Sequence, residues 1–283
     1  MVTLKNEFLE VKIAEKGAEI RSVICDGTEQ MWKGDPDIWG GVAPLLFPIC
    51  GGLKDDKYIL KGKEYTLQKH GYARFTVFDV ETSEETMAVF LHTSNEDTKK
   101  CFPFDYELRV IYTLKGRSID VEYNVYNKSD ETMYFSIGSH EGFSTPEGIE
   151  AYDIVFDEET TLTASGLWGN IVTDVSRTVL KESKVLPLYD KEFLIDALVF
   201  RKCSARAATL RNRQNGRKVR VDFPNAPTFF IWHKHQAPYI CLEPWLGLPD
   251  VVGSSYDITE KEGILALDAG KTFKNIHTIT FGE

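Results

Sequence analysis

The sequence predicts an all-β protein, a large antiparallel β-sandwich, and two observations support this. Apolar and polar residues alternate with a period of two through most of the chain, which is the pattern of half-buried strands. No window longer than about ten residues repeats with the 3.6-residue period of an amphipathic helix. Because parallel sheets need crossover helices of about a dozen residues or more, we expect the strands to pair in antiparallel fashion.

The clearest pair of strands lies before the middle of the chain. Every second residue of Tyr106–Leu114 is apolar, 115–118 contains a turn glycine, and Ile119–Val125 alternates again, which predicts a hairpin. Similar short runs predict strands at Phe8–Ile13, Glu19–Cys25, Phe75–Val80, Met87–His92, Thr132–Ile137, Ile154–Phe156, Ala208–Leu210, Val219–Phe223, Thr228–Trp232, Tyr239–Leu242, Gly263–Leu267 and Phe273–Phe281. So many strands in one chain favour two packed sheets.

The chain shows no internal division. Its 283 residues contain no linker, low-complexity stretch or internal repeat, and 42% hydrophobic and 27% charged residues is an ordinary globular composition. Large sandwiches often exceed the usual domain length of about 150 residues. We therefore expect residues 1–283 to form a single β-sandwich domain.

Composition and charge argue against several classes of partner. A net charge of −10 gives no general attraction for nucleic acid or for an anionic membrane. The basic run 211–218 surrounds an Asn-Gly pair, which predicts a solvated hairpin tip. No apolar run reaches the roughly 20 residues of a membrane span, and the N-terminus does not resemble a signal peptide. Five cysteines without a C-x-x-C motif predict reduced thiols and a cytoplasmic protein.

Two histidines stand where a strand meets a glycine-rich turn. In the segment 69–74, His70 precedes Gly71, which allows close approach of the backbone to another group. In the segment 136–143, His140 lies between two glycines at the end of a strand and is well placed to face a ligand. A structural role, with each ring hydrogen-bonded inside the fold, remains the alternative for both.

A glutamate and a tryptophan end the apolar strand that begins at Tyr239. Glu243 follows four consecutive residues of low polarity and precedes Pro244, so its carboxyl should be partly desolvated. Desolvation raises the pKa of a carboxyl towards the range of a general base near neutral pH. A buried structural ion pair is the alternative. Trp245 either stacks on the apolar face of a sugar ring or belongs to the core.

His233 and His235 have the spacing of metal ligands on a strand. Residues two apart share a face, so the two imidazoles could bind one metal ion together with Glu243 or His277. This pattern faintly resembles the metal site of cupins, but Glu243 follows His235 by eight residues, against the four or five of cupins. Solvated histidines at a strand end are the preferred interpretation, and we expect no metal.

Several segments together resemble the aldose 1-epimerase (galactose mutarotase-like) family, most closely its lactose-operon X-like branch. The resemblance covers nearly the whole chain and rests on the order of weak motifs. They are Ala43–Ile49 (APLLFPI), Leu53–Tyr58 (LKDDKY), His70–Arg74 (HGYAR), Gly138–His140 (GSH), Asp196–Leu198 (DAL) and Glu243–Gly247 (EPWLG).

The resemblance implies a β-supersandwich fold and an isomerase that interconverts the α and β anomers of an aldose without a cofactor. It implies that Glu243 is the general base for the C1 hydroxyl and that His140 is the general acid for the ring oxygen. His70 would hydrogen-bond the sugar, and Asp196 is the best match for an aspartate that binds sugar hydroxyls. Arg74 matches an arginine that contacts substrate in the sugar-phosphate members.

Three positions depart from the family pattern. Gly41 and Gly52 stand where relatives often have arginine, and Glu141 replaces a proline after the acid histidine. With Arg74 and Lys69 as the cations in and beside the matched HGYAR segment, these changes predict a neutral sugar over its 6-phosphate, because anion recognition relies on arginine. Glu141 is also expected to raise the pKa of His140.

The leading hypothesis is therefore a mutarotase acting on a free hexose as a monomer or homodimer. A carbohydrate-binding protein without catalytic activity is the second hypothesis, favoured by the same three departures. A sugar-phosphate epimerase, an accessory domain of a lyase or hydrolase, and a cupin-like metalloenzyme are the remaining alternatives. The sequence does not specify which sugar is bound.

Overall fold

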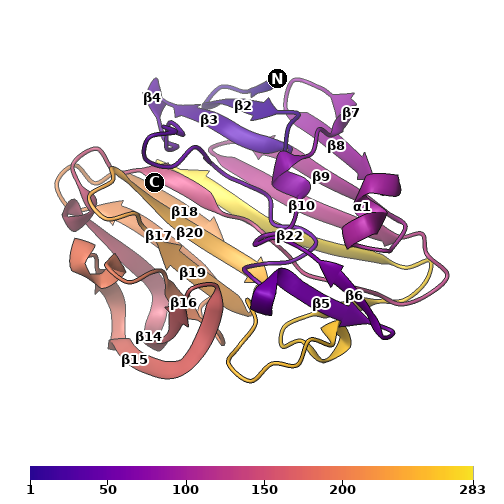
Figure 1. Ribbon diagram of the computed structural model, residues 1–283. Helices are drawn as coiled ribbons and strands as arrows, with labels where there is room; N and C mark the ends of the chain where they lie inside the picture. The colour runs from indigo at the N-terminus through magenta and orange to yellow at the C-terminus, as the bar shows by residue number, and fades with distance from the viewer. Residues whose placement is uncertain (283) are drawn as a thin grey trace.

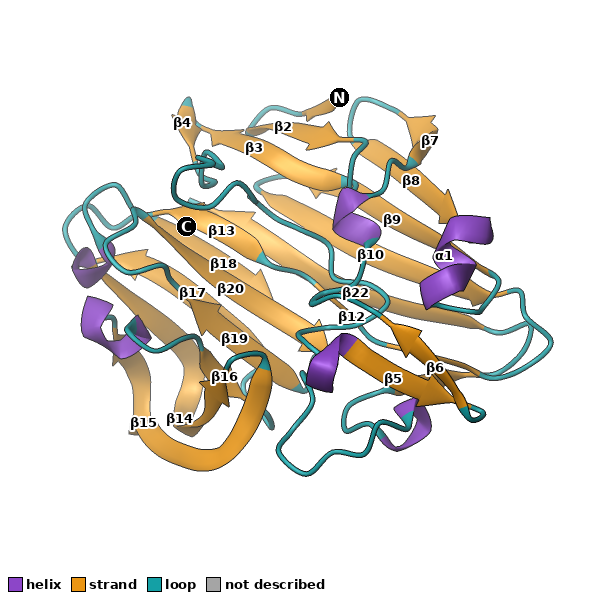
Figure 2. Ribbon diagram, viewed as in Figure 1, coloured by secondary structure: helices purple, strands orange, loops and turns teal. Residues whose placement is uncertain are grey.

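The computed structural model describes residues 1–282, and strands dominate it (Figures 1 and 2). One sheet of fourteen strands runs in the order β12-β20-β19-β16-β14-β17-β18-β22-β10-β9-β8-β7, with β13 paired to β20 and β15 to β14. Its strands are β7 (Asp79–Ser83), β8 (Met87–Thr93), β9 (Tyr106–Lys115), β10 (Ser118–Asn127), β12 (Ile137–Gly138), β13 (Glu141–Ser144), β14 (Tyr152–Trp168), β15 (Ile171–Pro187), β16 (Leu198–Phe200), β17 (Ala207–Asn212), β18 (Lys218–Asp222), β19 (Thr228–Trp232), β20 (Tyr239–Leu246) and β22 (Thr272–Phe281).

A second sheet, β1-β2-β3-β4, lies against one half of the large sheet, over β8 to β10 in Figure 1. Its strands, with those of two small two-stranded sheets, are β1 (Val2–Lys5), β2 (Leu9–Ala14), β3 (Glu19–Cys25), β4 (Thr28–Glu29), β5 (Lys57–Leu60), β6 (Lys63–Thr66), β11 (Met133–Phe135) and β21 (Leu265–Leu267). All named strand pairings are antiparallel, which confirms the predicted all-β sandwich class.

One apolar cluster joins the layers. Val11 and Ile13 of β2 belong to the same buried cluster as Leu108 and Val110 of β9. Alternate residues along each strand supply these side chains, as the period of two predicted. A continuous core supports the interpretation of residues 1–283 as a single domain, which stays a prediction.

Helices are few and short. The α-helix α1 (Glu96–Cys101) begins at Asn95, whose side chain accepts hydrogen bonds from the N–H groups of Asp97 and Thr98. The 3₁₀ helices are η1 (Lys54–Asp56), η2 (Ala73–Phe75), η3 (Ile149–Ala151), η4 (Asp190–Phe193) and η5 (Ile258–Glu260). None of the helices in the described chain has the length and apolarity that crossing a bilayer requires.

Several predicted elements came out differently. The strand predicted at Tyr239–Leu242 continues through Glu243 to Leu246 as β20, and the strand predicted at Thr132–Ile137 is divided into β11 and β12. The predicted strand Phe75–Val80 is wrong at its start, because η2 ends at Phe75 and β7 begins only at Asp79. The short strand expected at Ile154–Phe156 is part of β14, which pairs with β15 as a long curved arm. Repeated register shifts and many exposed residues along this arm remove the regular alternation by which a strand is recognised.

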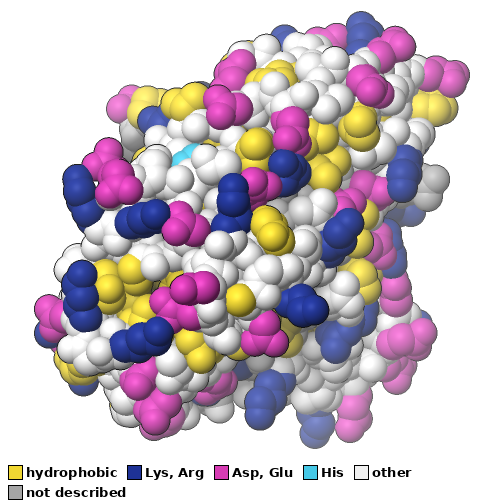
Figure 3. Space-filling view, turned by 90° about the vertical axis from the view of Figure 1, so that its right-hand side faces the viewer, with side chains coloured by type: hydrophobic (Ala, Val, Ile, Leu, Met, Phe, Trp, Pro, Cys, Tyr) yellow, Lys and Arg dark blue, Asp and Glu magenta, His cyan; other side chains and the backbone are white. Residues whose placement is uncertain are grey.

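The predicted hairpins are confirmed. β9 and β10 pair with Leu114 opposite Ile119, and the basic run 211–218 forms the turn between β17 and β18. Two arginines of this turn, Arg211 and Arg213, bind the buried carboxylate of Asp153 at 3.0 and 2.9 Å. On the face shown in Figure 3, basic and acidic side chains are interspersed. Neither feature offers a broad basic surface to nucleic acid.

Candidate active site

A cavity of about 550 Å³ opens beside β19 and β20. Its wall is assembled from distant parts of the chain: the loops at 39–52 and 69–74, the turn before β13, the tip of the β14–β15 arm, and the loop after η4. The volume lies in the range of small-molecule sites. Six residues singled out in the sequence all line it, namely His70, Arg74, His140, Asp196, Glu243 and Trp245.

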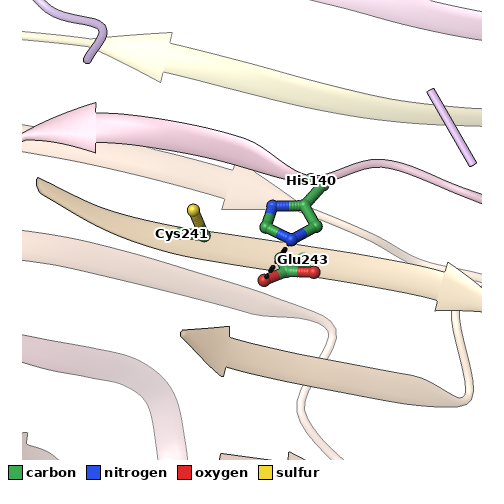
Figure 4. A group of neighbouring side chains, drawn as sticks. All are labelled: His140, Cys241 and Glu243. Carbon is green, nitrogen blue, oxygen red and sulfur yellow. Dashed lines mark ion pairs between the residues drawn. The ribbon is translucent and has the colours of Figure 1, made fainter. Parts of the chain in front are cut away.

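His140 and Glu243 form the centre of this site. Glu243 extends from β20, and His140 lies in the turn between β12 and β13, two strands that both pair with β20. The Nε2 atom of His140 is 3.5 Å from Oε1 of Glu243, while the side chains are 12% and 2% exposed (Figure 4). Within residues 1–282, the structural ion-pair alternative for Glu243 has His140 as its one partner, and that partner lines the same cavity.

Burial is the main cause of the shifted pKa of Glu243. It raises the pKa of the carboxyl well above its usual value, and the negative charges of Glu141 and Asp196 raise it further against the opposing effect of Lys69. Its Oε2 atom is buried and has no hydrogen-bond partner among the described residues. Glu243 therefore has the desolvated carboxyl that the apolar run before it predicted.

The pKa of His140 is shifted in the opposite direction. Burial lowers it to about 3, and the positive charges of Lys69 and Arg74 also lower it, against a backbone hydrogen bond that raises it. Between the two pKa values the pair carries one proton, which resides on the carboxyl of Glu243. A pair with a single proton can donate with one member and accept with the other.

The expected effect of Glu141 on His140 is wrong. Strand alternation turns Glu141 to the other face of the sheet, where its Oε1 lies 2.8 Å from Nε2 of His277. Both side chains are buried, at 4% and 2% exposed. The charge of Glu141 acts through the sheet and raises the pKa of Glu243, so its electrostatic effect reaches the other member of the pair.

His70 is fixed by two hydrogen bonds to Gly51. The amide of His70 donates to the Gly51 carbonyl at 2.8 Å, and the Gly51 amide donates to Nδ1 of His70 at 3.1 Å. An accepting Nδ1 places the ring proton on Nε2, which makes this atom a donor. Burial lowers the pKa of His70 well below its usual value, and the electrostatic effects of the His140 ring, Lys69 and Arg74 lower it further, so the ring stays neutral.

The backbone around His70 explains the neighbouring glycine. His70 and Gly71 both have positive φ, 66° and 67°. A Cβ atom at Gly71 would lie 2.2 Å from the carbonyl oxygen of Phe47, which accepts hydrogen bonds from the amides of Tyr72 and Ala73. The close backbone approach predicted for Gly71 is therefore to Phe47, and it anchors the loop that carries His70.

Arg74 and Asp196 both line the cavity. The guanidinium of Arg74 donates to the Lys69 carbonyl at 2.9 Å, and its buried Nε has no partner in residues 1–282. Partial burial lowers the pKa of Arg74. Asp196 accepts from the Ala197 amide with one oxygen at 2.7 Å, which leaves the other oxygen available for sugar hydroxyls.

Trp245 belongs to the core. It is 3% exposed, its ring stacks on Phe230 with centroids 3.7 Å apart, and its Nε1 donates to the Ser139 carbonyl.

Two other tryptophans, not identified from the sequence, flank the acid/base pair. The ring of Trp39 lies 5.0 Å and that of Trp232 5.5 Å from the ring of His140, and both are partly exposed in the cavity. The sequence feature that could have pointed to Trp232 as a site residue was its position at the end of a predicted strand.

His233 and His235 bind a shared carboxylate. Asp190 accepts from Nε2 of His233 at 2.7 Å and pairs with His235 through its other oxygen. The second nitrogen of His233 faces the Tyr239 carbonyl at 2.7 Å, which leaves His233 no free lone pair for a metal. Of the other two ligands considered, Glu243 faces His140 and His277 binds Glu141. The cupin-like arrangement is therefore absent from the described residues.

The two glycines that replace arginine are covered by other side chains. A Cβ at Gly41 would lie 2.7 Å from the Trp39 ring, and one at Gly52 would lie 2.4 Å from Cβ of Asn170. Trp39 and Asn170 both line the cavity. A larger residue at either position would displace the side chain that now shapes the wall.

Taken together, the sandwich and its cavity define a protein with a buried acid/base pair, open to a small ligand between aromatic walls. The chain belongs to the aldose 1-epimerase family, since the model of the family described as "Aldose 1-epimerase" matches residues 1–255. This confirms the family resemblance drawn from the motifs.

Individual relatives agree with this assignment. The plasmid-encoded protein LacX of Lactococcus lactis subsp. lactis is 33% identical, over 99% of this chain and 98% of its own. A galactose mutarotase related enzyme from Lactobacillus acidophilus superposes with a TM-score of 0.95 at 35% identity, over 99% of this chain and 97% of that one. A galactose mutarotase-like protein from Lactobacillus casei ATCC 334 gives 0.94 at 30% identity, over both complete chains. The fold is therefore galactose mutarotase-like.

Proposed function

We propose that the protein is an aldose 1-epimerase that interconverts the α and β anomers of a free hexose without a cofactor. The observation that carries the proposal is the 3.5 Å approach of His140 to Glu243 inside the cavity. Ring opening of a hemiacetal needs one group that accepts the C1 hydroxyl proton and one that protonates the ring oxygen. The membership of the family and the galactose mutarotase names of two relatives support the same activity.

In the proposed reaction Glu243 accepts the proton of the C1 hydroxyl while His140 donates a proton to the ring oxygen. The C1–O5 bond breaks, and the C1 oxygen becomes the carbonyl of the open-chain aldehyde. Rotation about C1–C2 then presents the other face of the carbonyl to the C5 hydroxyl. On closure O5 bonds to C1 and returns its proton to His140, and the C1 oxygen recovers its proton from Glu243. No proton is gained or lost over the cycle.

This cycle begins with the proton on His140, whereas burial places it on Glu243 in the empty cavity. Transfer of one proton within the pair, whose nearest atoms are 3.5 Å apart, converts one state into the other. Sugar hydroxyls that donate hydrogen bonds to the carboxylate favour its charged form, so substrate binding promotes this transfer.

Other residues of the cavity fit the binding of a sugar. The Nε2–H group of His70 is a donor for a sugar oxygen, because Nδ1 is held by Gly51. Asp196 supplies a carboxylate oxygen for hydroxyl groups. Trp39 and Trp232 provide apolar ring surface beside His140, of the kind that packs on the C–H face of a pyranose.

Polarimetry of freshly dissolved α-D-glucose and α-D-galactose tests the proposal. The protein should accelerate the approach to the equilibrium rotation, and His140→Ala should remove most of the acceleration. A matched control is Glu158→Gln on β14, whose side chain is 91% exposed. If the protein leaves the rate unchanged but calorimetry detects sugar binding, it is a carbohydrate-binding protein without catalysis. Absence of both would refute a sugar site.

A sugar phosphate is a second candidate substrate, and a specific observation favours it. Lys234 joins Lys69 and Arg74 in the cavity wall, while Glu141, expected beside the phosphate, is turned away and paired. The expected repulsion by Glu141 is therefore removed, while the absence of arginine at Gly41 and Gly52, the carboxyl of Glu243 and the net charge of −10 still favour a neutral sugar. Comparison of kcat/KM for glucose and glucose 6-phosphate decides: a tenfold preference for the phosphate would replace the free hexose in the proposal.

A further inference from the structure

Cys241 lies beside the acid/base pair and has no part in the proposed reaction. It precedes Glu243 by two residues on β20, so both side chains project from the same face of the strand. His140 approaches this face from the turn before β13 (Figure 4). One ligand atom from each of the three side chains lies within 4.8 Å of the other two.

The three side chains form a donor set suited to zinc. A thiolate, an imidazole nitrogen and a carboxylate oxygen are the ligands zinc prefers, and three protein ligands leave a fourth position for water or another small ligand. Tetrahedral zinc, with bonds of about 2.0–2.3 Å, holds its ligand atoms roughly 3.3–3.8 Å apart. The 3.5 Å between His140 and Glu243 lies within that range, and the thiol needs to approach by about 1 Å at most.

The charges and unpaired atoms of the site favour a cation. Cys241 is fully buried and lies close to the buried carboxyl of Glu243. A divalent ion would neutralise one thiolate and one carboxylate, which removes the cost of burying both negative charges. Nδ1 of His140 and Oε2 of Glu243 are buried without hydrogen-bond partners in residues 1–282, so ligation disrupts no existing network.

We propose that His140, Cys241 and Glu243 form an inhibitory site for Zn²⁺ in the wall of the cavity, where His140 and Glu243 reach its surface and Cys241 lies buried behind them. Zinc bound there occupies the imidazole and the carboxylate together, so neither can transfer a proton to or from a sugar. The inhibition, though not the binding itself, rests on the proposed epimerase function. The site differs from the His233 and His235 pattern considered from the sequence, because it uses neither residue.

Cobalt(II) tests the binding without any assay of activity. Titration of Co²⁺ into the full-length protein should produce a near-ultraviolet thiolate-to-cobalt charge-transfer band that saturates at one ion per chain, and Zn²⁺ should abolish it. Cys241→Ala should lose the band and bind Zn²⁺ at least tenfold more weakly. The matched control is Cys203→Ala, another buried cysteine, which is not part of the group with His140 and Glu243 and should behave as wild type.

A second variant distinguishes the loss of a zinc ligand from misfolding of Cys241→Ala. His140→Gln changes a partly exposed ligand and should also weaken Zn²⁺ binding at least tenfold, with an unchanged circular dichroism spectrum. No charge-transfer band in wild type, or equal zinc affinity in wild type and Cys241→Ala, would overturn the proposal. In polarimetry, zinc should inhibit wild type more strongly than Cys241→Ala. A band in a protein without epimerase activity would uphold the site and refute the proposed function.

Discussion

Replacement of Glu243 by glutamine should change activity and stability in opposite directions. The substitution keeps the size of the side chain but removes the charge and the capacity to accept a proton. Glu243 is buried, its Oε2 has no partner in the described chain, and its Oε1 faces His140, a histidine whose own pKa is lowered. The folded protein therefore disfavours the charged carboxylate that the proposed reaction requires.

The expected magnitudes follow from these contacts. A general base contributes about 10²–10⁴-fold to a rate, so Glu243→Gln should lose roughly that factor in kcat. A buried charged group without full hydrogen bonding costs about 1–3 kcal/mol or more, so the variant should be more stable by about this amount at neutral pH. For a chain of this size that corresponds to roughly 2–10 °C in Tm.

The stability difference should depend on pH with a definite sign. The pKa of Glu243 is raised in the folded state, so the protonated carboxyl stabilises the fold at low pH, and this contribution is lost as pH rises. The gain in Tm of Glu243→Gln over wild type should therefore be small near pH 4.5 and grow towards pH 8. The same raised pKa sets a high acidic limb in the pH–rate profile of the wild type.

Calorimetric melting between pH 4.5 and 8, with polarimetry on the same samples, measures both effects. Glu158→Gln makes the same chemical change on an exposed carboxylate and should alter neither quantity. Wild-type turnover in Glu243→Gln would refute the assignment of the base. Loss of activity with a fall in Tm at every pH would show that the carboxylate stabilises the fold, against the reasoning above.

Three further outcomes are expected. His70→Ala should lower kcat less than His140→Ala and raise KM, because His70 donates a hydrogen bond to the sugar; equal wild-type kinetics in both variants would place the sugar elsewhere. Exhaustive chelation should not lower the rate, and a loss that a divalent ion restores would contradict the metal-free mechanism. His277→Leu should destabilise the protein by about 3–5 kcal/mol in urea unfolding, because it leaves Glu141 buried without its partner; a change below about 1 kcal/mol would show that the pair is not charged.

Local sequence pattern was sufficient for the class of fold. The period of two in segments such as 106–114 and 119–125 reports directly which residues face the core, since a strand alternates its side chains by geometry. The β14–β15 arm escaped recognition because bulges interrupt its pairing and solvent reaches much of it. The start of the segment 75–80 was misjudged because a 3₁₀ turn follows the loop that packs on Phe47.

The sequence also identified the central polar groups of the candidate site, because His70 precedes a glycine, His140 lies between two glycines and Glu243 precedes a proline. Their meeting depends on pairing between segments more than a hundred residues apart, as when the strands flanking His140 pair with β20. The direction of a side chain depends on tertiary packing in the same way. The sheet separates Glu141 from His140, and the stack on Phe230 keeps Trp245 almost fully buried in the cavity wall, where Trp39 and Trp232 are partly exposed. Residue types are local information, whereas burial, partners and therefore pKa values are properties of the assembled fold.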